Sequence, residues 1–215
     1  MPPYEYLICD LDETLYPRQS GLMGEIGRRI HLYMTQQMGF SPEEAAAFRQ
    51  RSLAQYGTAL RGLQVEYAVN ADDYLAFVHD VPLDNYLAPN SNLDTMLGRI
   101  PLRKAVFTNA DTAHARRVMG RLGVAHHFPV VVDIHALQFD CKPAVAAYRR
   151  LLDIVGVPGE ACILVEDMAR NLRPARELYG FTTVLVDGDE SEGVDYSLRD
   201  LMELGPLVDR LVRVG

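Results

Sequence analysis

The chain has 215 residues, of which 48% are hydrophobic and 23% are charged, and its formal net charge at pH 7 is −8. This composition is typical of a soluble globular protein, and no apolar run approaches the ~20 residues that a membrane-spanning helix needs. The negative balance argues against a nucleic-acid-binding protein, which needs a basic face. Cysteines without metal-type spacing, and an amino terminus unlike a signal peptide, predict a protein of the reducing cytoplasm.

Strands are predicted where short runs of β-branched and aromatic residues occur. They cover residues 4–9, 104–108, 129–132, 161–165 and 182–186. Their nearly continuous apolar character is typical of parallel strands that are buried on both faces. Helical patterns at 113–122, 145–155 and 174–179 alternate with the later strands, which predicts an α/β fold with a parallel sheet. A final apolar helix is predicted at 201–214, packed against the sheet or against a partner subunit.

The long interval between the first two strands contains no strand pattern and is predicted to be helical. Ser41 begins a Ser-Pro-Glu-Glu capping box with proline at the first helical position. Asn70 is a second candidate N-cap, because two acidic residues follow it in the first turn. We therefore predict a helical cap, residues 18–100, inserted after the first strand, and a core formed by residues 1–17 and 101–215.

Acidic residues follow two of the predicted strands. Asp10 and Asp12 come after the first strand, and Glu166 and Asp167 follow the fourth. Side chains two positions apart in a strand point to the same side, and the carboxyl ends of parallel strands form the ligand-binding edge of an open α/β sheet. The four carboxylates are therefore candidates for a metal site and a nucleophile. The alternative is that each segment is only a solvated acidic turn or an acidic helix start.

Residues suited to phosphate binding occur at two further places. Thr108 and Asn109 close the second strand, where a hydroxyl and backbone N–H groups can donate to phosphoryl oxygens, although such residues also cap turns. Lys142 precedes Pro143, which fits the first position of a helix. A lysine at that end of a helix opposes the helix dipole, so the pattern favours a functional role for Lys142.

The order of these motifs resembles the haloacid dehalogenase superfamily of phosphatases. The shared features are Asp10-Leu11-Asp12-Glu13-Thr14, Thr108, Lys142-Pro143 and Glu166-Asp167. The resemblance covers the whole chain and implies a Rossmann-like parallel sheet with a mobile helical cap. It also implies that Asp10 attacks phosphorus to form an aspartyl phosphate and that Asp12 protonates the leaving oxygen. Thr108, the backbone N–H of Asn109 and Lys142 would hold the phosphoryl oxygens.

The same resemblance implies a Mg²⁺ site. Its ligands would be Asp10, the main-chain carbonyl of Asp12 and Asp167, with Glu166 acting through a bound water. Oxygen ligands together with waters suit Mg²⁺ better than zinc. Dehalogenases of the superfamily lack an acid at the position of Asp12, because a halide leaves without a proton, so the resemblance favours a phosphatase.

A finer resemblance lies in the insert and around the second strand. Segments 56–63, 72–80 and 107–110 are similar to the pyrimidine 5′-nucleotidase branch of the superfamily. We therefore expect a 5′-nucleotidase that hydrolyses UMP- and CMP-like monophosphates, with a small-molecule partner rather than a nucleic acid or a membrane. The alternatives are a phosphatase of another small metabolite, such as a sugar phosphate or phosphoglycolate, and a non-catalytic binding protein. The sequence leaves the oligomeric state open.

Individual residues of the insert are candidates for substrate recognition. Tyr56, Thr58 and Arg61 are predicted to face the cleft, where an aromatic ring would stack on a base and polar groups would contact its edge. His79 and His114 are expected to make structural hydrogen bonds rather than substrate contacts.

Overall fold

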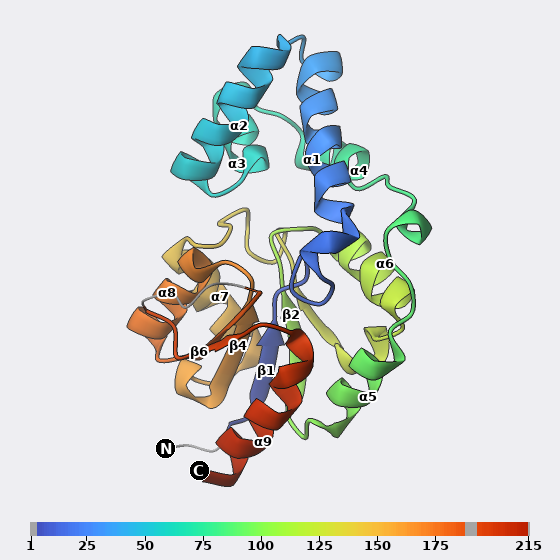
Figure 1. Cartoon of the computed structure of the whole chain (residues 1–215). Helices are drawn as coiled ribbons and strands as arrows, with labels where there is room; N and C mark the ends of the chain where they lie inside the picture. Colours follow the sequence, from blue (N-terminus) through green and yellow to red (C-terminus); the bar gives the residue numbers. More distant parts are fainter. Residues whose placement is uncertain (1–3, 188–192, 215) are drawn as a thin grey trace.

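The computed structural model describes residues 4–187 and 193–214. A parallel sheet lies at the centre of this part of the chain, and a lobe of helices stands over the carboxyl ends of its strands (Figure 1). The sheet has six strands in the spatial order β3-β2-β1-β4-β5-β6. Their bounds are β1 Tyr6–Cys9, β2 Arg103–Phe107, β3 Val130–Val132, β4 Cys162–Glu166, β5 Thr182–Val186 and β6 Tyr196–Leu198.

The predicted α/β fold and its five parallel strands are confirmed. The sequence predicts no strand at β6, which pairs in parallel with β5 and closes that edge of the sheet. Tyr196 and Ser197 are exposed and only Leu198 is buried, so this short edge strand lacks the apolar run that marks the others. An apolar run makes a strand visible in a sequence, and Tyr196–Leu198 has no such run.

Side chains alternate along β1 and divide the core into two layers. Leu7 and Cys9 pack in the cluster that contains α5, α6 and α9, whereas Tyr6 and Ile8 pack with α7 and α8. The bounds of these helices are α5 Ser91–Arg99, α6 Thr112–Leu122, α7 Val145–Val155, α8 Ala169–Tyr179 and α9 Leu204–Val214. The final helix, α9, therefore packs against the sheet, which is one of the two places predicted for it.

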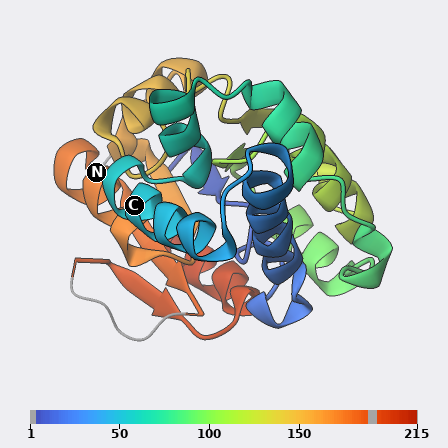
Figure 2. The ribbon, with the colours of Figure 1, turned by 90° about the horizontal axis from the view of Figure 1, so that it is seen from above.

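The insert after β1 forms a helical lobe with its own hydrophobic core, and Figure 2 shows this lobe lying over the sheet domain. Its helices are α1 Leu22–Leu32, α2 Pro42–Tyr56, α3 Ala59–Tyr67 and α4 Ala71–Val78. The capping box at Ser41 and the N-cap at Asn70 are both confirmed. Met34, Phe48, Leu63 and Tyr74 are among the buried side chains that hold these helices together.

The last part of the predicted cap packs with the sheet domain. Leu93, Met96 and Leu97 of α5 belong to the same buried cluster as Leu204 and Leu207 of α9. The division of the chain at residues 17 and 100 stays a prediction. The packing of α5 argues for a return to the sheet domain soon after α4 instead.

The predicted start of one helix, and the predicted place of a proline before another, are wrong. α7 begins at Val145 with Ala144 as its N-cap, so the prediction that Pro143 occupies the first helical position is wrong. The Lys142–Pro143 peptide bond is cis and lies in the loop before the helix. α8 begins at Ala169, so Pro174 lies inside this helix and not at its start, where the sequence predicts it.

Short turns complete the described part of the chain. They are the 3₁₀ turns Arg18–Ser20, Leu83–Asn85, Ala125–His127, Gly159–Ala161 and Leu201–Glu203, and a π-helical segment, Tyr33–Gln37. Among the described helices, none combines the length and the apolar character that crossing a bilayer requires.

Candidate active site

Three carboxylates meet at the carboxyl edge of the sheet between β1 and β4. Asp10 directly follows β1, Glu166 ends β4 and Asp167 comes next. The two strands are paired with Cys9 opposite Val165, and the backbone N–H of Asp10 donates to the Val165 carbonyl at 2.9 Å. This register brings ligand atoms of the three acids to within 4.8 Å of one another. The sheet therefore gathers three of the predicted site residues.

Lys142 reaches the same edge from the loop between β3 and α7. Its ammonium group donates to Asp10 Oδ1 at 2.7 Å, to Glu166 Oε2 at 2.7 Å and to the Phe107 carbonyl at 2.9 Å. The side chain of Asn109 accepts the Lys142 backbone N–H at 2.8 Å and donates to the Lys142 carbonyl at 3.2 Å. A loop clamped by Asn109 therefore presents the lysine, in place of the predicted helix N-terminus.

Burial governs the ionisation of this group. Burial raises the pKa of Asp10 to about 8, with the charge of Glu166 adding to the effect and Lys142 opposing it. Burial also raises the pKa of Glu166. For Lys142, burial acts to lower the pKa, but the charges of Asp10 and Glu166 outweigh it and raise the pKa above its usual value. One buried ammonium group thus serves two buried carboxylates, and a bound cation would balance the excess negative charge.

The donor atoms of this edge fit a hard divalent cation. All are carboxylate oxygens, which Mg²⁺ prefers. Both oxygens of Glu166 already accept hydrogen bonds, Oε2 from Lys142 and Oε1 from the Met168 N–H at 3.3 Å. No described residue donates to Asp10 Oδ2, and Asp167 pairs at 3.3 Å with Arg18, whose side chain is 58% exposed. Asp10 and Asp167 are therefore the carboxylates best placed for direct ligation. Water-mediated contact by Glu166, and ligation by the Asp12 carbonyl, stay predictions.

Thr108 and Asn109 line the same cavity as Asp10 and Lys142. The buried hydroxyl of Thr108 accepts the Ala110 N–H at 3.0 Å, so its hydrogen is available to a bound anion. The side-chain amide of Asn109 is engaged at both ends by Lys142. Its direct contribution to a substrate would come from the backbone N–H, as the sequence analysis predicts.

Asp12 lies two residues beyond Asp10, and one of its oxygens has two polar neighbours. The Tyr16 hydroxyl donates to Asp12 Oδ1 at 2.6 Å, and His114 Nε2 lies 3.2 Å from the same oxygen. Burial opposes ionisation of Asp12, but His114 and Tyr16 outweigh it and hold the pKa of Asp12 below its usual range. His114 thus makes a structural hydrogen bond, as expected, and its partner is the candidate acid–base residue. Because 102 residues separate the two, the sequence offered no signal for this pairing.

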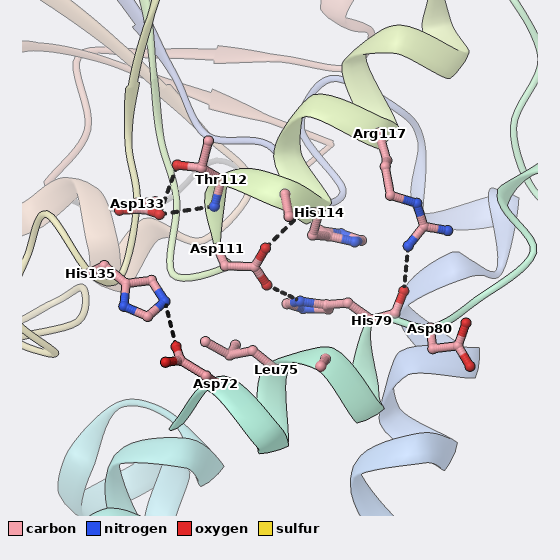
Figure 3. A pocket seen from close by; sticks show the side chains of 12 residues that line it. Asp72, Leu75, His79, Asp80, Asp111, Thr112, His114, Arg117, Asp133 and His135 are labelled. Carbon is pink, nitrogen blue, oxygen red and sulfur yellow. Dashed lines mark hydrogen bonds and ion pairs between the residues drawn. The ribbon is translucent and has the colours of Figure 1, made fainter. Parts of the chain in front are cut away.

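The His114 ring stacks on the His79 ring, which comes from the C-terminal end of α4 (Figure 3). The ring centroids are 4.1 Å apart and the planes differ by 18°. Asp111 connects the two residues: its Oδ1 accepts the His114 backbone N–H at 2.8 Å, and its Oδ2 lies 2.6 Å from His79 Nδ1. A cavity of about 530 Å³ lies beside this group. The helical lobe and the sheet domain are therefore joined through Asp111 and the two rings.

The candidate catalytic residues open onto a second cavity, also of about 530 Å³, whose two walls differ. The sheet wall contains Asp10, Asp12, Thr108, Asn109, Lys142 and Asp167. The cap wall is mainly apolar, with Met23, Ile26, Ile30, Leu53 and Leu60. Tyr56 and Arg61 are not among the described residues that line this cavity, so their predicted position is wrong. Thr58 does line it, although its hydroxyl accepts the Arg61 N–H at 3.1 Å as the N-cap of α3.

Arg49 of α2 is a cation on the cap wall that the sequence analysis missed. It is half-buried, and no residue in the described ranges forms a hydrogen bond or an ion pair with it. Its guanidinium lies against Gly27, where an added Cβ would stand 3.0 Å from one of its nitrogens. The sequence could not distinguish Arg49 from its neighbour Arg51, which pairs with Glu66 at the surface.

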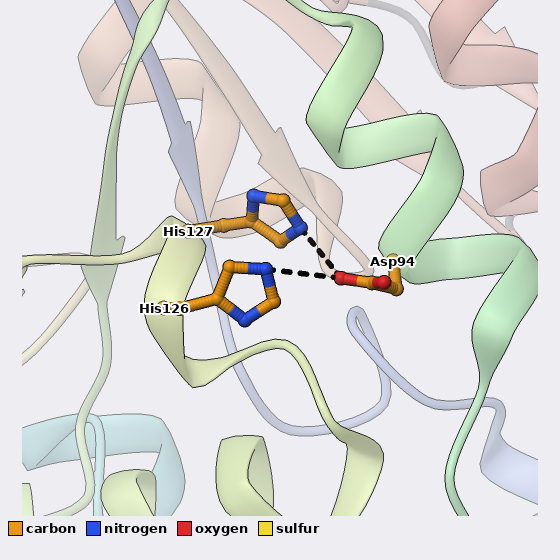
Figure 4. A group of neighbouring side chains, drawn as sticks. All are labelled: Asp94, His126 and His127. Atoms are coloured by element: carbon orange, nitrogen blue, oxygen red, sulfur yellow. Dashed lines mark hydrogen bonds and ion pairs between the residues drawn. The ribbon is translucent and has the colours of Figure 1, made fainter.

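A second group with metal-binding residue types lies away from this cavity (Figure 4). Asp94 Oδ1 is 2.8 Å from His127 Nε2 and 3.1 Å from His126 Nε2. The carboxylate thus lies within hydrogen-bond distance of His127 and forms an ion-pair contact with His126. These contacts connect α5 to the turn Ala125–His127, and they account for the arrangement of the three side chains without a metal ion.

The fold and the acidic edge are those of an α/β enzyme with an inserted helical lobe. Comparison with known families identifies which family of α/β enzymes this is. The model of the family described as haloacid dehalogenase-like hydrolase matches residues 4–178. The chain belongs to the haloacid dehalogenase-like hydrolases.

Individual relatives are more distant. "Phosphate metabolism protein 8" of Saccharomyces cerevisiae is 27% identical over 158 residues, which make up 66% of this chain and 49% of that protein. The chain thus spans about half the length of this curated relative. A HAD phosphatase from Thermococcus onnurineus has a TM-score of 0.62 at 17% identity, covering 95% of this chain and 97% of that one. An L-2-haloacid dehalogenase from Xanthobacter autotrophicus has a TM-score of 0.63 at 15% identity, covering 96% of this chain and 98% of that one. These two structures share the fold, and a phosphatase and a dehalogenase match it equally well.

Proposed function

We propose that this protein is a Mg²⁺-dependent phosphomonoesterase that acts through an aspartyl phosphate on Asp10. The observation that carries the proposal is the second carboxylate, Asp12, on the same wall of the cavity as Asp10 and Lys142. An ester oxygen needs a proton to leave, whereas a halide does not, so a second acid suits phosphate ester hydrolysis. The match to a yeast protein named for phosphate metabolism supports the same choice.

The residues of the site have separable roles in this reaction. One oxygen of Asp10 would attack phosphorus and the other would remain for the metal and for Lys142, which bonds Oδ1; Oδ2 is therefore the proposed nucleophile. The Thr108 hydroxyl and the Asn109 backbone N–H would donate to the phosphoryl oxygens, and the ammonium group of Lys142 would balance their charge. Asp12 would give a proton to the leaving oxygen and later take one from the attacking water.

Mg²⁺ is the metal that the oxygen donors favour. Asp10 and Asp167 would bind it directly. When bound, it would neutralise negative charge on the phosphoryl group and on the carboxylates. Its binding would also favour the ionised form of Asp10, which burial disfavours.

For the substrate we propose pyrimidine nucleoside 5′-monophosphates. A cavity of about 530 Å³ with one charged and one apolar wall suits a small amphipathic ester. The apolar side chains of α1 and the α2–α3 region would pack against a base, and Arg49 would donate to its carbonyl oxygens. A sugar phosphate or phosphoglycolate would use the same catalytic residues and less of the apolar wall.

Three buried free cysteines support a reducing cytoplasmic compartment.

The test is phosphate release with Mg²⁺ from UMP, CMP, AMP, phosphoglycolate, a sugar phosphate and para-nitrophenyl phosphate, with Asp10→Asn as the control. Preference for UMP and CMP that is lost in the variant is the expected result. Activity confined to the other esters would keep the mechanism and overturn the substrate. No activity on any ester would overturn the function and favour a non-catalytic binding protein.

A further inference from the structure

The two oxygens of Asp12 differ in their surroundings. Oδ1 accepts from Tyr16 and lies within hydrogen-bond distance of His114 Nε2, at 2.6 and 3.2 Å. No residue in the described part of the chain donates to Oδ2. Asp12 lines the cavity that contains Asp10, whereas His114 lines the other cavity. Oδ2 is thus the oxygen available to a substrate.

We propose that Tyr16 and His114 are positioning residues that present Asp12 Oδ2 to the leaving-group oxygen, an inference that rests on the proposed phosphatase function. Oδ1 is engaged by both Tyr16 and His114 and is a poor site for a proton, so a proton that Asp12 takes up or gives away during the reaction is carried by Oδ2. The donors on Oδ1 also fix the rotation of the carboxyl group. The carboxyl plane is then in place before the substrate binds, and Oδ2 is the oxygen through which a proton passes to the leaving group, which is the geometric requirement of general acid catalysis.

The two chemical steps use this one oxygen. First, Asp10 Oδ2 forms a bond to phosphorus while the bond from phosphorus to the leaving oxygen breaks. The electron pair of that broken bond takes the proton from Asp12 Oδ2, which yields an alcohol and the aspartyl phosphate. Then water attacks phosphorus and gives a proton to Asp12 Oδ2, and the bond from phosphorus to Asp10 breaks to release inorganic phosphate.

The surroundings of His114 indicate that its role is the hydrogen bond to Asp12. Its side chain is fully buried, and its Nδ1 atom has no hydrogen-bond partner among the described residues. A buried polar atom without a partner is unfavourable, and an apolar side chain of similar size would avoid this penalty. The hydrogen bond from His114 Nε2 to Asp12 offsets this penalty.

A residue of the helical lobe, His79, helps to hold His114 in place. The His79 ring stacks on the His114 ring, and Asp111 holds both residues. Arg117 donates to the His79 carbonyl at 2.8 Å and to the Val81 carbonyl at 2.7 Å, which fixes the chain after α4. His114 therefore cannot rotate away from Asp12 without displacing a residue of the lobe.

Two substrates whose leaving groups differ in their need for a proton test the proposal. The variants Tyr16→Phe and His114→Phe are compared with the unmodified enzyme by kcat/KM for para-nitrophenyl phosphate and ethyl phosphate. A para-nitrophenolate leaves without protonation, whereas an ethoxide does not. We expect each variant to lose about tenfold or more on ethyl phosphate and no more than about twofold on para-nitrophenyl phosphate. His114→Gln, which keeps a donor near the position of Nε2, should recover much of the loss.

Two matched variants control for general effects of the substitutions. Tyr4→Phe removes a tyrosine hydroxyl that bonds Thr182 Oγ1 at 2.7 Å near the amino end of the sheet. His127→Gln changes a histidine that contacts Asp94 instead of the site. Both should leave the ratio of the two kcat/KM values unchanged, and circular dichroism and thermal unfolding establish that every variant is folded.

Each outcome decides between the two proposals. A selective loss on ethyl phosphate in the two Phe variants supports the positioning role. Equal losses on both esters, with the unmodified enzyme active, would overturn the positioning role and leave the phosphatase function standing. If the unmodified enzyme hydrolyses neither these esters nor the nucleotides, the proposed function fails and the positioning role fails with it.

Discussion

The wall of the cleft formed by the sheet and the wall formed by the insert differ in what holds their side chains. On the sheet wall the charged groups have specific partners: the Lys142 ammonium group has three acceptors, and Asp12 Oδ1 has two polar neighbours. On the cap wall the side chains are mainly apolar, and Arg49 has no polar partner in the described ranges. One wall is fixed by directional bonds and the other by packing.

This difference suggests a division of labour. Strand register sets the distances on the sheet wall, so this wall suits the invariant part of a reaction, the phosphoryl group. The cap wall makes few directional bonds, so a change of one side chain alters its shape without disturbing the charged residues. The cap wall therefore suits the variable part of a substrate, its leaving group.

Replacement of Lys142 by Met should have the largest effect, because it removes the shared partner of two buried carboxylates. Loss of one preorganised donor lowers turnover by about 10²–10³-fold. Leaving buried charges unpaired costs about 3–5 kcal/mol of unfolding free energy. Phosphate release and urea denaturation measure the two effects.

Lys104 provides the matched control for this variant. It is the chain's other lysine, and its ammonium group donates to the Ile100 and Leu102 carbonyls at 2.7 and 3.0 Å, at the amino end of β2. Lys104→Met should lower stability and leave turnover unchanged. If Lys142→Met retains turnover within about threefold of the unmodified enzyme, Lys142 does not provide the charge balance of the sheet wall.

The affinity for Mg²⁺ should depend strongly on pH, because the carboxylates that would bind it lie on the sheet wall and titrate. Because burial raises the pKa of Asp10 from 3.8 to about 8, the metal-free protein keeps a proton there that the unfolded chain has lost. Metal-free stability should therefore fall as pH rises from about 4 to 8, while Mg²⁺ affinity should rise about tenfold per pH unit up to about 8. Calorimetry at pH 6, 7 and 8.5 measures this affinity. An affinity that does not change with pH would contradict this expectation, and Asp10→Asn should weaken the dependence, because Glu166 also has a raised pKa.

The sequence predicted the sheet wall far better than the cap wall, for a physical reason. Asp10, Thr108 and Glu166 each lie at the end of a buried strand, so a local pattern and one rule about parallel sheets place them together. Arg49 and His114 acquire their positions from contacts between segments far apart in the chain. Neither residue has a local pattern that distinguishes it from ordinary surface or core residues.

Arg49→Met should affect substrate binding rather than chemistry. Loss of a guanidinium that contacts the leaving group should raise KM for UMP about tenfold, with little change in KM for para-nitrophenyl phosphate or in kcat. Arg51→Met is the matched control, because Arg51 lies on the same helix and pairs with Glu66 outside the cavity. Equal KM changes for the two substrates would show that the cap wall does not select the leaving group through Arg49.

The smallest effect is expected at the seam between the two walls, where Asp111 pairs with His79. Burial opposes ionisation of Asp111, but the hydrogen bond from His79 outweighs it and holds the pKa below the usual 3.8. The stabilisation is therefore present above pH 3.8 and is lost as pH falls through the lower pKa of the folded state.

Asp111→Asn keeps an N-cap for α6 and loses the charge, so it should lower the unfolding free energy by about 1 kcal/mol at pH 7. The difference should shrink when urea denaturation is repeated at pH 3. Asp94→Asn changes the more exposed aspartate–histidine group and should lower stability by less than about 0.5 kcal/mol at pH 7. Equal effects of the two substitutions would mean that the seam holds the helical lobe no more firmly than a surface contact does.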